Sequence, residues 1–361
     1  MRLTLVHDWL NQLGGAEDVL KTLVEMYPQA PIYTSIYWHD KMPPEWQAWN
    51  LHTLWIDRLP LIHQKHQLYF PLYPLAWRGL HVQDVDVVLS NKSGFCHGLN
   101  TEAVHICYCL APTRYVWQYE AYMERENVPR PARALLRPLV GYLKRWDYQA
   151  AQRVDHFIAI STEIQQRIQH YYDRDSVIIY PPVETERFQP VGQPDDYFLS
   201  LGRLIPYKRV DLAVQACTRL GLPLKVAGRG RDLERLQAMA GPTVEFLGYV
   251  PNEALPELFA RAKAFIFPGL EDFGITPVQA QAAGRPVIAF KGGGALDTVL
   301  AGVTGEFFEE PTVESLMAVL QNFDATRYNP TDCRDHALRF DSRVFKTQLS
   351  AFIEQALVAK E

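Results

Sequence analysis

Residues 268–290, PGLEDFGITPVQAQAAGRPVIAF, place a carboxylate and an amide around the expected start of a helix. Thr276 is suited to cap that helix, with Pro277 as its first residue and Gln279 as its third. The unpaired N–H groups at such a start favour a phosphate, and Glu271 just ahead could accept hydrogen bonds from hydroxyl groups. The alternative is that Thr276 and Gln279 form a capping box and that Glu271 is a solvated loop carboxylate.

A second candidate group follows an expected strand in residues 200–214, SLGRLIPYKRVDLAV. Gly202 and Arg203 end the strand, and Lys208 stands near the start of the next helix. Two cations at the carboxyl end of a strand suit a diphosphate whose charge grows as it leaves. Standing alone, such residues would more often solvate a face of the domain, but these share a half of the chain with Glu271.

Glycine-rich turns give weaker signals. Gly14 and Gly15 lie between an expected strand and an expected helix, where backbone can approach a phosphate, although an ordinary turn explains them equally well. Residues 291–299, KGGGALDTV, are similar. The D-x-D pattern of residues 84–86 precedes a strand rather than following one, so it is interpreted as a strand entry and not as a metal site.

Composition indicates a two-domain protein without nucleic-acid partners. A chain of 361 residues is too long for one ordinary core, and a net charge of −5 gives no general attraction to nucleic acid. The five cysteines contain no C-x-x-C pair, which favours a reducing cytosol over disulfides or a zinc site. With neither a signal-peptide core nor a run of roughly 18 apolar residues, a cytoplasmic location is expected.

Short β-branched runs alternate with helical patterns, which predicts an α/β chain with parallel sheets. The proline-rich stretch 180–198 is the best linker, so the halves are 1–185 and 186–342. Each half is expected to be a doubly wound sheet, with a ligand at the carboxyl ends of the strands, facing a cleft between the halves. Residues 343–361 are expected to form a helix, and packing back on the first half is one option for it.

Taken in order, these segments resemble the retaining glycosyltransferases of family 4, which have the GT-B fold of two Rossmann-like domains. The resemblance covers nearly the whole chain, through segments that include VHDWLNQLGGAEDVL, CYCLAPTRYVW, GRLIPYKRVDLAV, VEFLGYV and FPGLEDFGITPVQAQAAGRPVIAF. It is similar to a branch that includes mannosyltransferases of bacterial polysaccharide assembly. It implies an acceptor-side domain at 1–185 and a nucleotide-sugar domain at 186–342.

The resemblance also implies roles for single residues. Arg203 and Lys208 would bind the diphosphate and Glu271 the sugar hydroxyls, and these three are the expected catalytic residues. The expected donor-binding residues are Gly14, Gly15, Gly202, Gly228, Gly248, Tyr249, Phe273, Gly274, Ile275, Thr276 and Gln279. Among them, Gly248 and Tyr249 would lie at the base and Gly228 near the nucleoside.

Two positions depart from the family pattern. Gln279 stands where relatives carry a glutamate that binds ribose; an amide can accept one hydrogen bond and donate another. Leu110 stands where relatives often have a histidine near the reacting carbon. His7 or His97 is the suggested substitute, with a buried structural histidine as the alternative for each, and Arg114 is also placed on the acceptor side.

The implied function is transfer of a hexose, best matched by mannose from GDP-mannose, to a glycan or lipid-linked acceptor in cell-surface polysaccharide or glycolipid synthesis. Front-side attack with retention and no metal or other cofactor is expected. Rival readings are a UDP-sugar donor, a non-catalytic nucleotide-sugar-binding subunit and a sugar-nucleotide epimerase. Aromatic and basic segments at 58–80 and 125–153 suit an anionic membrane surface, peripherally on the inner face of the plasma membrane, or equally an ordinary core with a solvated face.

Overall fold

The computed structural model describes residues 1–125 and 129–359 and divides into two compact units. Unit 1 comprises Met1–Pro182 and Phe345–Glu361, and unit 2 comprises Val183–Val344. These boundaries differ slightly from those expected from the sequence, residues 185 and 342. The stretch 183–188 is tied into unit 2, because the Val183 N–H donates to the Phe340 carbonyl at 3.0 Å and the Thr185 hydroxyl donates to the Asp341 carboxylate.

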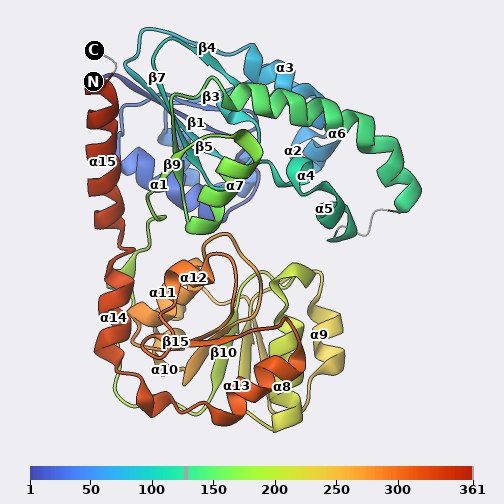
Figure 1. Ribbon diagram of the computed structural model, residues 1–361, viewed down its shortest axis with the longest axis vertical. Helices are drawn as coiled ribbons and strands as arrows, with labels where there is room; N and C mark the ends of the chain where they lie inside the picture. The colour runs from blue at the N-terminus through green and yellow to red at the C-terminus, as the bar shows by residue number, and fades with distance from the viewer. Residues whose placement is uncertain (126–128, 360–361) are drawn as a thin grey trace. The chain divides into compact units, whose positions relative to one another are not determined.

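Unit 1 is built on a seven-stranded parallel sheet with the order β3-β2-β1-β5-β7-β8-β9 (Figure 1). The central strands are fully buried runs of mainly apolar residues, as expected for a parallel sheet covered on both faces. The strands are β1 (Leu3–His7), β2 (Ile32–Thr34), β3 (Leu51–Thr53), β5 (Val87–Lys92), β7 (Val104–Cys109), β8 (His156–Ala159) and β9 (Ser176–Ile178), with a separate pair β4 (His81–Val82) and β6 (Asn100–Thr101).

The helices of unit 1 include one long amphipathic helix, α6, and several short ones. They are α1 (Gly15–Met26), α2 (Ile62–Lys65), α3 (Tyr73–Arg78), α4 (Arg114–Trp117), α5 (Tyr119–Arg125), α6 (Arg130–Ala151) and α7 (Thr162–Tyr172). Short 3-10 helices are η1 (His39–Lys41), η2 (Pro44–Ala48), η3 (Trp55–Arg58), η4 (His66–Leu72) and η5 (Cys96–Gly98). No helix of the described residues is long and apolar enough to cross a membrane.

The last helix, α15 (Ser342–Val358), lies mostly in unit 1 (Figure 1). The Phe345 ring packs edge-on against Tyr108 of β7, with the ring centroids 5.6 Å apart, and Phe352 packs against His156 of β8 at 5.8 Å. The Lys346 amino group pairs with the Glu25 carboxylate at 2.8 Å. The chain therefore leaves unit 1 at residue 182 and returns to it for its last helix.

Unit 2 carries a six-stranded parallel sheet with the order β12-β11-β10-β13-β14-β15. Its strands are β10 (Phe198–Leu201), β11 (Leu224–Ala227), β12 (Val244–Gly248), β13 (Ala264–Phe267), β14 (Val287–Phe290) and β15 (Gly305–Phe308). Its helices are α8 (Val210–Leu220), α9 (Leu233–Met239), α10 (Leu255–Arg261), α11 (Ile275–Ala282), α12 (Ala295–Thr298), α13 (Val313–Asn322) and α14 (Pro330–Leu338), with 3-10 helices η6 (Thr185–Arg187), η7 (Pro206–Lys208), η8 (Asn252–Ala254) and η9 (Ala325–Arg327).

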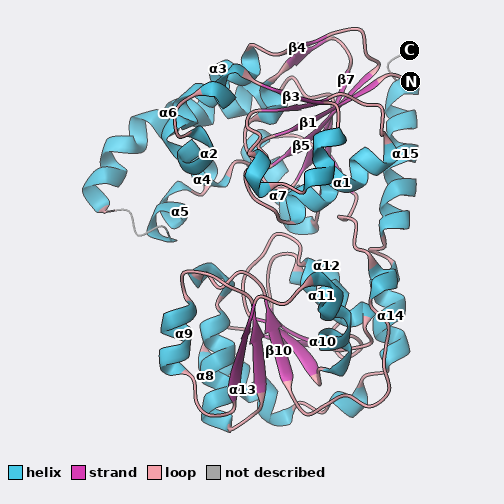
Figure 2. Cartoon of the chain, turned by 180° about the vertical axis from the view of Figure 1, so that it is seen from behind, coloured by secondary structure: helices cyan, strands magenta, loops and turns pink. Residues whose placement is uncertain are grey.

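The helices of unit 2 cover its sheet from both sides. In Figure 2, α8, α9 and α13 lie on one side of the strands and α10, α11 and α14 on the other, and the helices of each group pack against one another. The strand order reverses between β10 and β13, and in unit 1 it reverses between β1 and β5. Both units are therefore doubly wound Rossmann-like sheets, and the crevice at a reversal point is the usual ligand site of this architecture.

At the reversal point of unit 1, the Asp8 carboxylate is completely buried and holds the loop that follows β5. It accepts four backbone N–H bonds, from Ser93 and Gly94 at 2.6 Å to one oxygen, and from Phe95 at 2.6 Å and Cys96 at 2.8 Å to the other. Nothing larger than glycine fits at 94, because a Cβ there would lie 2.7 Å from the Trp9 ring. One side chain thus joins the loops after β1 and β5.

Replacing Asp8 by alanine should therefore destabilise unit 1 specifically. Four buried N–H donors would lose their acceptor, which we expect to lower the free energy of unfolding by about 4 kcal/mol. All eight tryptophans lie between residues 1 and 182, so urea unfolding followed by tryptophan fluorescence reports on unit 1. The exposed Asp40→Ala is the matched control. Equal urea midpoints for the two variants would contradict this role of Asp8.

Candidate functional site

The loops after β10 and β13 meet at the reversal point of unit 2. The Lys208 amino group, in the first loop, contacts the Glu271 carboxylate in the second, and each side chain is about one fifth exposed, 19% and 20%. The backbones are close as well, since a Cβ on Gly269 would lie 2.9 Å from the Lys208 Cα atom. Two of the three expected catalytic residues are therefore in direct contact at the carboxyl edge of the sheet.

A second glycine-rich loop supports Glu271 from behind. The Gly294 N–H donates to the Glu271 carbonyl at 2.8 Å. A Cβ on Gly294 would overlap the backbone of Phe273, and a Cβ on Gly293 would overlap the Glu271 carbonyl. Gly293 also has a φ of 57°, which favours glycine. The stretch 291–299, which the sequence indicated only as a phosphate-type turn, therefore fixes the position of the Glu271 loop.

The predicted start of helix α11 was wrong by two residues. Gly274, with a φ of 103°, precedes the first helical residue Ile275, so Thr276 is the second residue and not the cap. Pro277 is therefore the third helical residue and Gln279 the fifth. No side chain of the described residues caps the helix. The cause is tertiary: a Cβ at 274 would lie 3.1 Å from the Phe267 ring, and only glycine adopts that φ readily. The capping-box alternative is thereby excluded, and no side chain in the part of the chain that the structure describes accepts a hydrogen bond from the first N–H groups of α11.

The strand ends on the other side of the reversal point are joined through glycines. The Gly228 N–H donates to the Gly248 carbonyl at 2.6 Å, and a Cβ on Gly228 would overlap the Gly202 carbonyl. Beyond them, the Tyr249 ring is 61% exposed and the Arg229 guanidinium lies 5.6 Å from its centroid. Arg203 is exposed directly after Gly202. These residues form an open, cationic edge next to Lys208.

In unit 1, Gly14 and Gly15 are exposed at the start of α1, where Gly14 has an extended backbone with a φ of −177°. His7 is buried beneath that start. Its Nδ1 atom lies 3.2 Å from the Asn91 amide nitrogen, which indicates an N–H···N bond, and its Nε2 atom lies 3.6 Å from the Glu17 carboxylate. Arg114 is half-buried as the first residue of α4.

His97 lies inside unit 1 rather than on its surface. The ring is completely buried, and its Nε2 atom lies 3.4 Å from the Asp147 carbonyl. Burial and the nearby Lys92 ammonium hold the pKa of His97 well below its usual range, so the ring is neutral. From this position it meets only side chains and backbone of its own unit.

Asp86, at the expected strand entry, accepts a hydrogen bond from the Arg2 N–H at 2.6 Å and pairs with the Arg2 guanidinium at 3.8 Å. Among residues 1–125 and 129–359, no group of three or more His, Cys, Asp or Glu side chains is arranged to hold a metal ion. Asp86 is thus engaged in local structure directly before β5.

Two family models match consecutive parts of the chain. The model described as Glycosyltransferase Family 4 matches residues 13–187, and the model described as Glycosyl transferases group 1 matches residues 183–334. The chain belongs to glycosyltransferase family 4. The second model contains the Lys208 and Glu271 loops, so the reversal point of unit 2 lies within the matched region.

Relatives of this family 4 chain differ in name and in extent. It is 32% identical over 168 residues to the GDP-mannose-dependent alpha-(1-6)-phosphatidylinositol monomannoside mannosyltransferase of Mycolicibacterium smegmatis, covering 38% of this chain and 44% of that one. It is 26% identical to the D-inositol 3-phosphate glycosyltransferase of Streptomyces scabiei, covering 70% and 63%. The chain therefore spans less than two thirds of the length of either relative.

Solved structures show the same fold at low identity. The Anabaena protein HepE, crystallised in complex with UDP, superposes with a TM-score of 0.72 at 16% identity, covering 98% of this chain and 100% of HepE. The GT-B fold expected from the sequence is thus confirmed.

Two residues that hold the loops together, Gly269 and Asp8, are not among the residues that the sequence singled out. Gly269 allows the close backbone approach in unit 2, and Asp8 joins the loops of unit 1. Gly293 and Gly294 lie in the indicated stretch 291–299, but their packing against residues 271–273 was not predicted. The available signals were modest: Gly269 follows an apolar strand run directly after a proline, and Asp8 is an acidic residue just beyond a buried strand. Neither pattern identifies its partner loop.

Gly294→Ala should displace the Glu271 loop, because the added Cβ overlaps the Phe273 backbone. The φ of −66° at 294 suits alanine, so the effect is steric. We expect overpacking to cost about 1 to 3 kcal/mol and nucleoside diphosphate binding to weaken. Gly192→Ala in the same unit is the control, since a Cβ there meets nothing within 4 Å. Thermal melting with and without nucleotide checks both effects, and identical behaviour of the two variants would contradict the packing argument.

Proposed function

We propose that this chain is a retaining glycosyltransferase that moves a hexose from a nucleotide sugar to a glycan or lipid-linked acceptor in cell-surface polysaccharide or glycolipid synthesis. The observation that carries the proposal is the Lys208–Glu271 contact at the reversal point of unit 2. In this contact, the Lys208 ammonium, which would bind a phosphate, lies beside the Glu271 carboxylate, which would accept hydrogen bonds from sugar hydroxyls. GDP-mannose is the first choice of donor, because two relatives from Mycolicibacterium smegmatis are named as GDP-mannose-dependent enzymes.

In the proposed reaction, Arg203 and Lys208 stabilise the charge that develops on the leaving diphosphate. The acceptor hydroxyl oxygen bonds to the anomeric carbon on the face from which the phosphate oxygen departs. The electron pair of the broken carbon–oxygen bond goes to the departing phosphate oxygen, and the proton of the acceptor hydroxyl is transferred to the same phosphate oxygen. Glu271 accepts hydrogen bonds from sugar hydroxyls, and the uncapped N–H groups of α11 face the donor. The protein's cations, rather than a divalent metal, neutralise the diphosphate in this scheme.

We further propose which residues would bind the base, the ribose and the phosphates of the donor. The exposed Tyr249 ring with its Arg229 neighbour suits stacking on a nucleotide base. Gln279, half-buried on the second turn of α11, would serve the ribose with one donor and one acceptor. Gly14 and Gly15 of unit 1 would supply backbone N–H groups to the phosphates, and His7 and Arg114 remain on the acceptor side of the proposal.

A UDP-sugar is the second donor candidate, because HepE was crystallised with UDP and a tyrosine stacks on either base. Thermal shifts with GDP, UDP, ADP and their sugars separate these donors, since the nucleotide that binds raises the melting temperature. A non-catalytic nucleotide-sugar-binding subunit would bind donor without transferring the sugar. The charged groups at 203, 208 and 271 argue against that alternative, because binding alone does not require all three.

Arg203→Ala and Lys208→Ala should each reduce turnover about 100 to 1000-fold, as on removal of other preorganised electrostatic groups. The measurement is transfer of labelled mannose from GDP-mannose, or of glucose from UDP-glucose, to a membrane or glycan acceptor extract. Lys263→Ala is the matched control, since that lysine of unit 2 pairs with Asp196 and precedes β13, at the opposite end of the strand from the Glu271 loop. Turnover like the wild type in a folded Arg203 or Lys208 variant would contradict the mechanism.

We also propose that residues 58–80 rest on an anionic membrane surface. This segment contains Arg58, Lys65 and Arg78 and no acidic residue. Leu61, Leu68 and Leu75 are 60%, 70% and 62% exposed. Apolar side chains beside basic ones suit the boundary of an anionic leaflet. The second segment, 125–153, includes residues 126–128, which lie outside the described residues.

Leu68→Gln should weaken co-sedimentation with anionic vesicles about tenfold, the loss expected for one buried leucine. Binding should also fall with added salt. Val358→Gln is the control, since Val358 is similarly exposed on α15, in the same unit but outside the segment. Failure of the wild-type chain to bind anionic vesicles at low salt would remove the membrane proposal and leave the transfer reaction untouched.

A further inference from the structure

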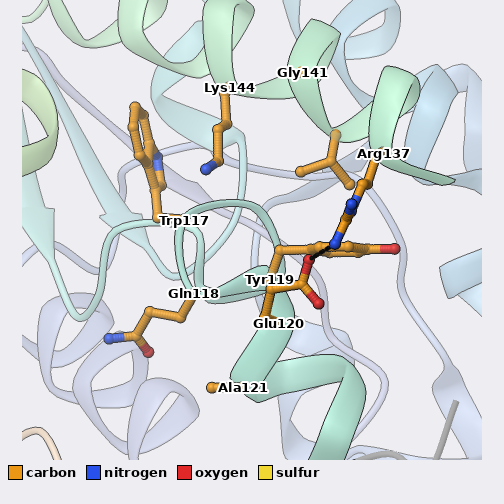
Figure 3. Close-up of a pocket in the computed structure, with 9 residues that line it drawn as sticks. Trp117, Gln118, Tyr119, Glu120, Ala121, Arg137, Gly141 and Lys144 are labelled. Atoms are coloured by element: carbon orange, nitrogen blue, oxygen red, sulfur yellow. Dashed lines mark hydrogen bonds and ion pairs between the residues drawn. The ribbon is translucent and has the colours of Figure 1, made fainter. Parts of the chain in front are cut away.

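Unit 1 contains a pocket of about 380 Å³ that the proposed donor site does not use. It lies between the α4–α5 segment and α6, and Figure 3 shows its lining residues. Trp117 and Tyr119 form its aromatic walls, Lys144 and Arg137 come from α6, and Gly141 lies between those two cations along the helix. Its volume is at the lower end for small-molecule sites, which is enough for one sugar ring with a charged substituent.

Lys144 is aimed into this pocket. Its amino group points into the open space beside Trp117 (Figure 3) and lies 5.6 Å from the centre of that ring. No carboxylate among the described residues forms an ion pair with it. The Trp117 ring is fixed, because its Nε1–H donates to the buried Asp147 at 2.6 Å and the ring stacks on Tyr171 at 5.0 Å. A positioned cation beside a rigid aromatic wall therefore faces solvent without a counter-ion.

The other end of the pocket carries a second cation, Arg137, whose carboxylate partner can be replaced by a ligand. Arg137 pairs with Glu120 at 2.9 Å, but the two side chains are 67% and 55% exposed. A surface pair of this kind contributes little, so a ligand anion can take the place of Glu120 at small cost. Between the cations, a Cβ on Gly141 would meet nothing within 4 Å. The missing side chain keeps the pocket open at the surface of a helix in which glycine is otherwise unfavourable.

We propose that this pocket binds an acidic sugar residue of the acceptor, a hexose carrying a phosphate or a carboxylate. Lys144 would meet the anion as a point charge, Arg137 would bind it through its planar fork, and the walls would pack on the sugar ring. The assignment to the acceptor rests on the proposed transfer reaction. The binding of an anionic sugar rests only on the pocket and its charges.

The test uses the full chain, both alone and with a saturating concentration of the nucleoside diphosphate that gives the larger thermal shift. Mannose 6-phosphate and glucuronic acid are the anionic probes and mannose is the neutral one, with binding followed by quenching of tryptophan fluorescence and by calorimetry. We expect both anions, or one of them, to bind more tightly than mannose. Whichever anion binds identifies the phosphate or the carboxylate form of the acceptor.

Three variants locate the binding. Lys144→Ala should weaken binding of the anionic sugar by roughly tenfold or more, the usual effect of losing a hydrogen bond to a charged group. Gly141→Leu should fill the pocket and abolish binding while leaving the melting temperature unchanged or raised, because leucine is the better helix former. Arg145→Ala removes the same charge from an exposed neighbour outside the lining and should leave binding unchanged.

The proposal is overturned if no probe binds in the millimolar range, if mannose binds as well as the anions, or if Lys144→Ala and Gly141→Leu bind like the wild type. Thermal shifts with nucleotide should be the same in all three variants, which keeps the two hypotheses apart. If the anionic sugars bind the pocket but no nucleotide binds any form of the chain, the proposed transfer function fails and the anion site stands.

Discussion

The fold of each unit depends on contacts between two loops, the ones that follow the two central strands at which the strand order reverses. Where the strand order reverses, the chain leaves one strand toward one face and leaves its neighbour toward the other face. Unit 1 joins the two loops with one buried carboxylate, Asp8, which accepts four backbone N–H bonds. Unit 2 joins them through backbone contact at Gly269 and through the Lys208–Glu271 pair. The Asp8 carboxylate of unit 1 is completely buried, whereas the Lys208 and Glu271 side chains of unit 2 are partly exposed.

The sequence predicted the larger elements because their signals are local. Strands such as β10, β13 and β14 are apolar runs bounded by polar residues or turn signals, and the run TPVQAQAAG correctly indicates a helix. The β-branched runs of the sequence do not include the three-residue strands β2, β3 and β9, each of which is too short to show a period. They also do not include the longer strands β7, β12 and β15. The start of α11 was misplaced because the φ of Gly274 is set by Phe267, which follows from the fold and not from neighbouring residues. The same holds for Gly294, whose partner Phe273 is distant in the chain.

A buried charged network connects the core of unit 1 to the pocket on its surface. The Lys92 amino group is fully buried and lies 3.3 Å from the Thr113 hydroxyl, which donates to the Asp147 carboxylate at 3.0 Å. Burial lowers the pKa of Lys92, but the nearby Asp147 carboxylate and other groups raise it above its usual value, so the lysine stays charged. Asp147 also accepts from Trp117 and from Tyr172 at 2.7 Å. The wall of the pocket is therefore anchored to β5 and α7, which gives a surface site the rigidity of the core.

The contact between Lys208 and Glu271 also explains how a site for an anion and a polyol can exist before either arrives. Separately, a partly buried ammonium and a partly buried carboxylate would each carry a desolvation penalty. In contact they compensate each other, and the glycine loop at 292–294 holds the backbone of Glu271 in place. In the proposed reaction, the phosphate of a nucleotide sugar would replace the carboxylate at Lys208, and its hydroxyl groups would replace the ammonium at Glu271. Binding would then exchange one set of charge-assisted bonds for another, so affinity would depend on how well the donor matches both partners at once.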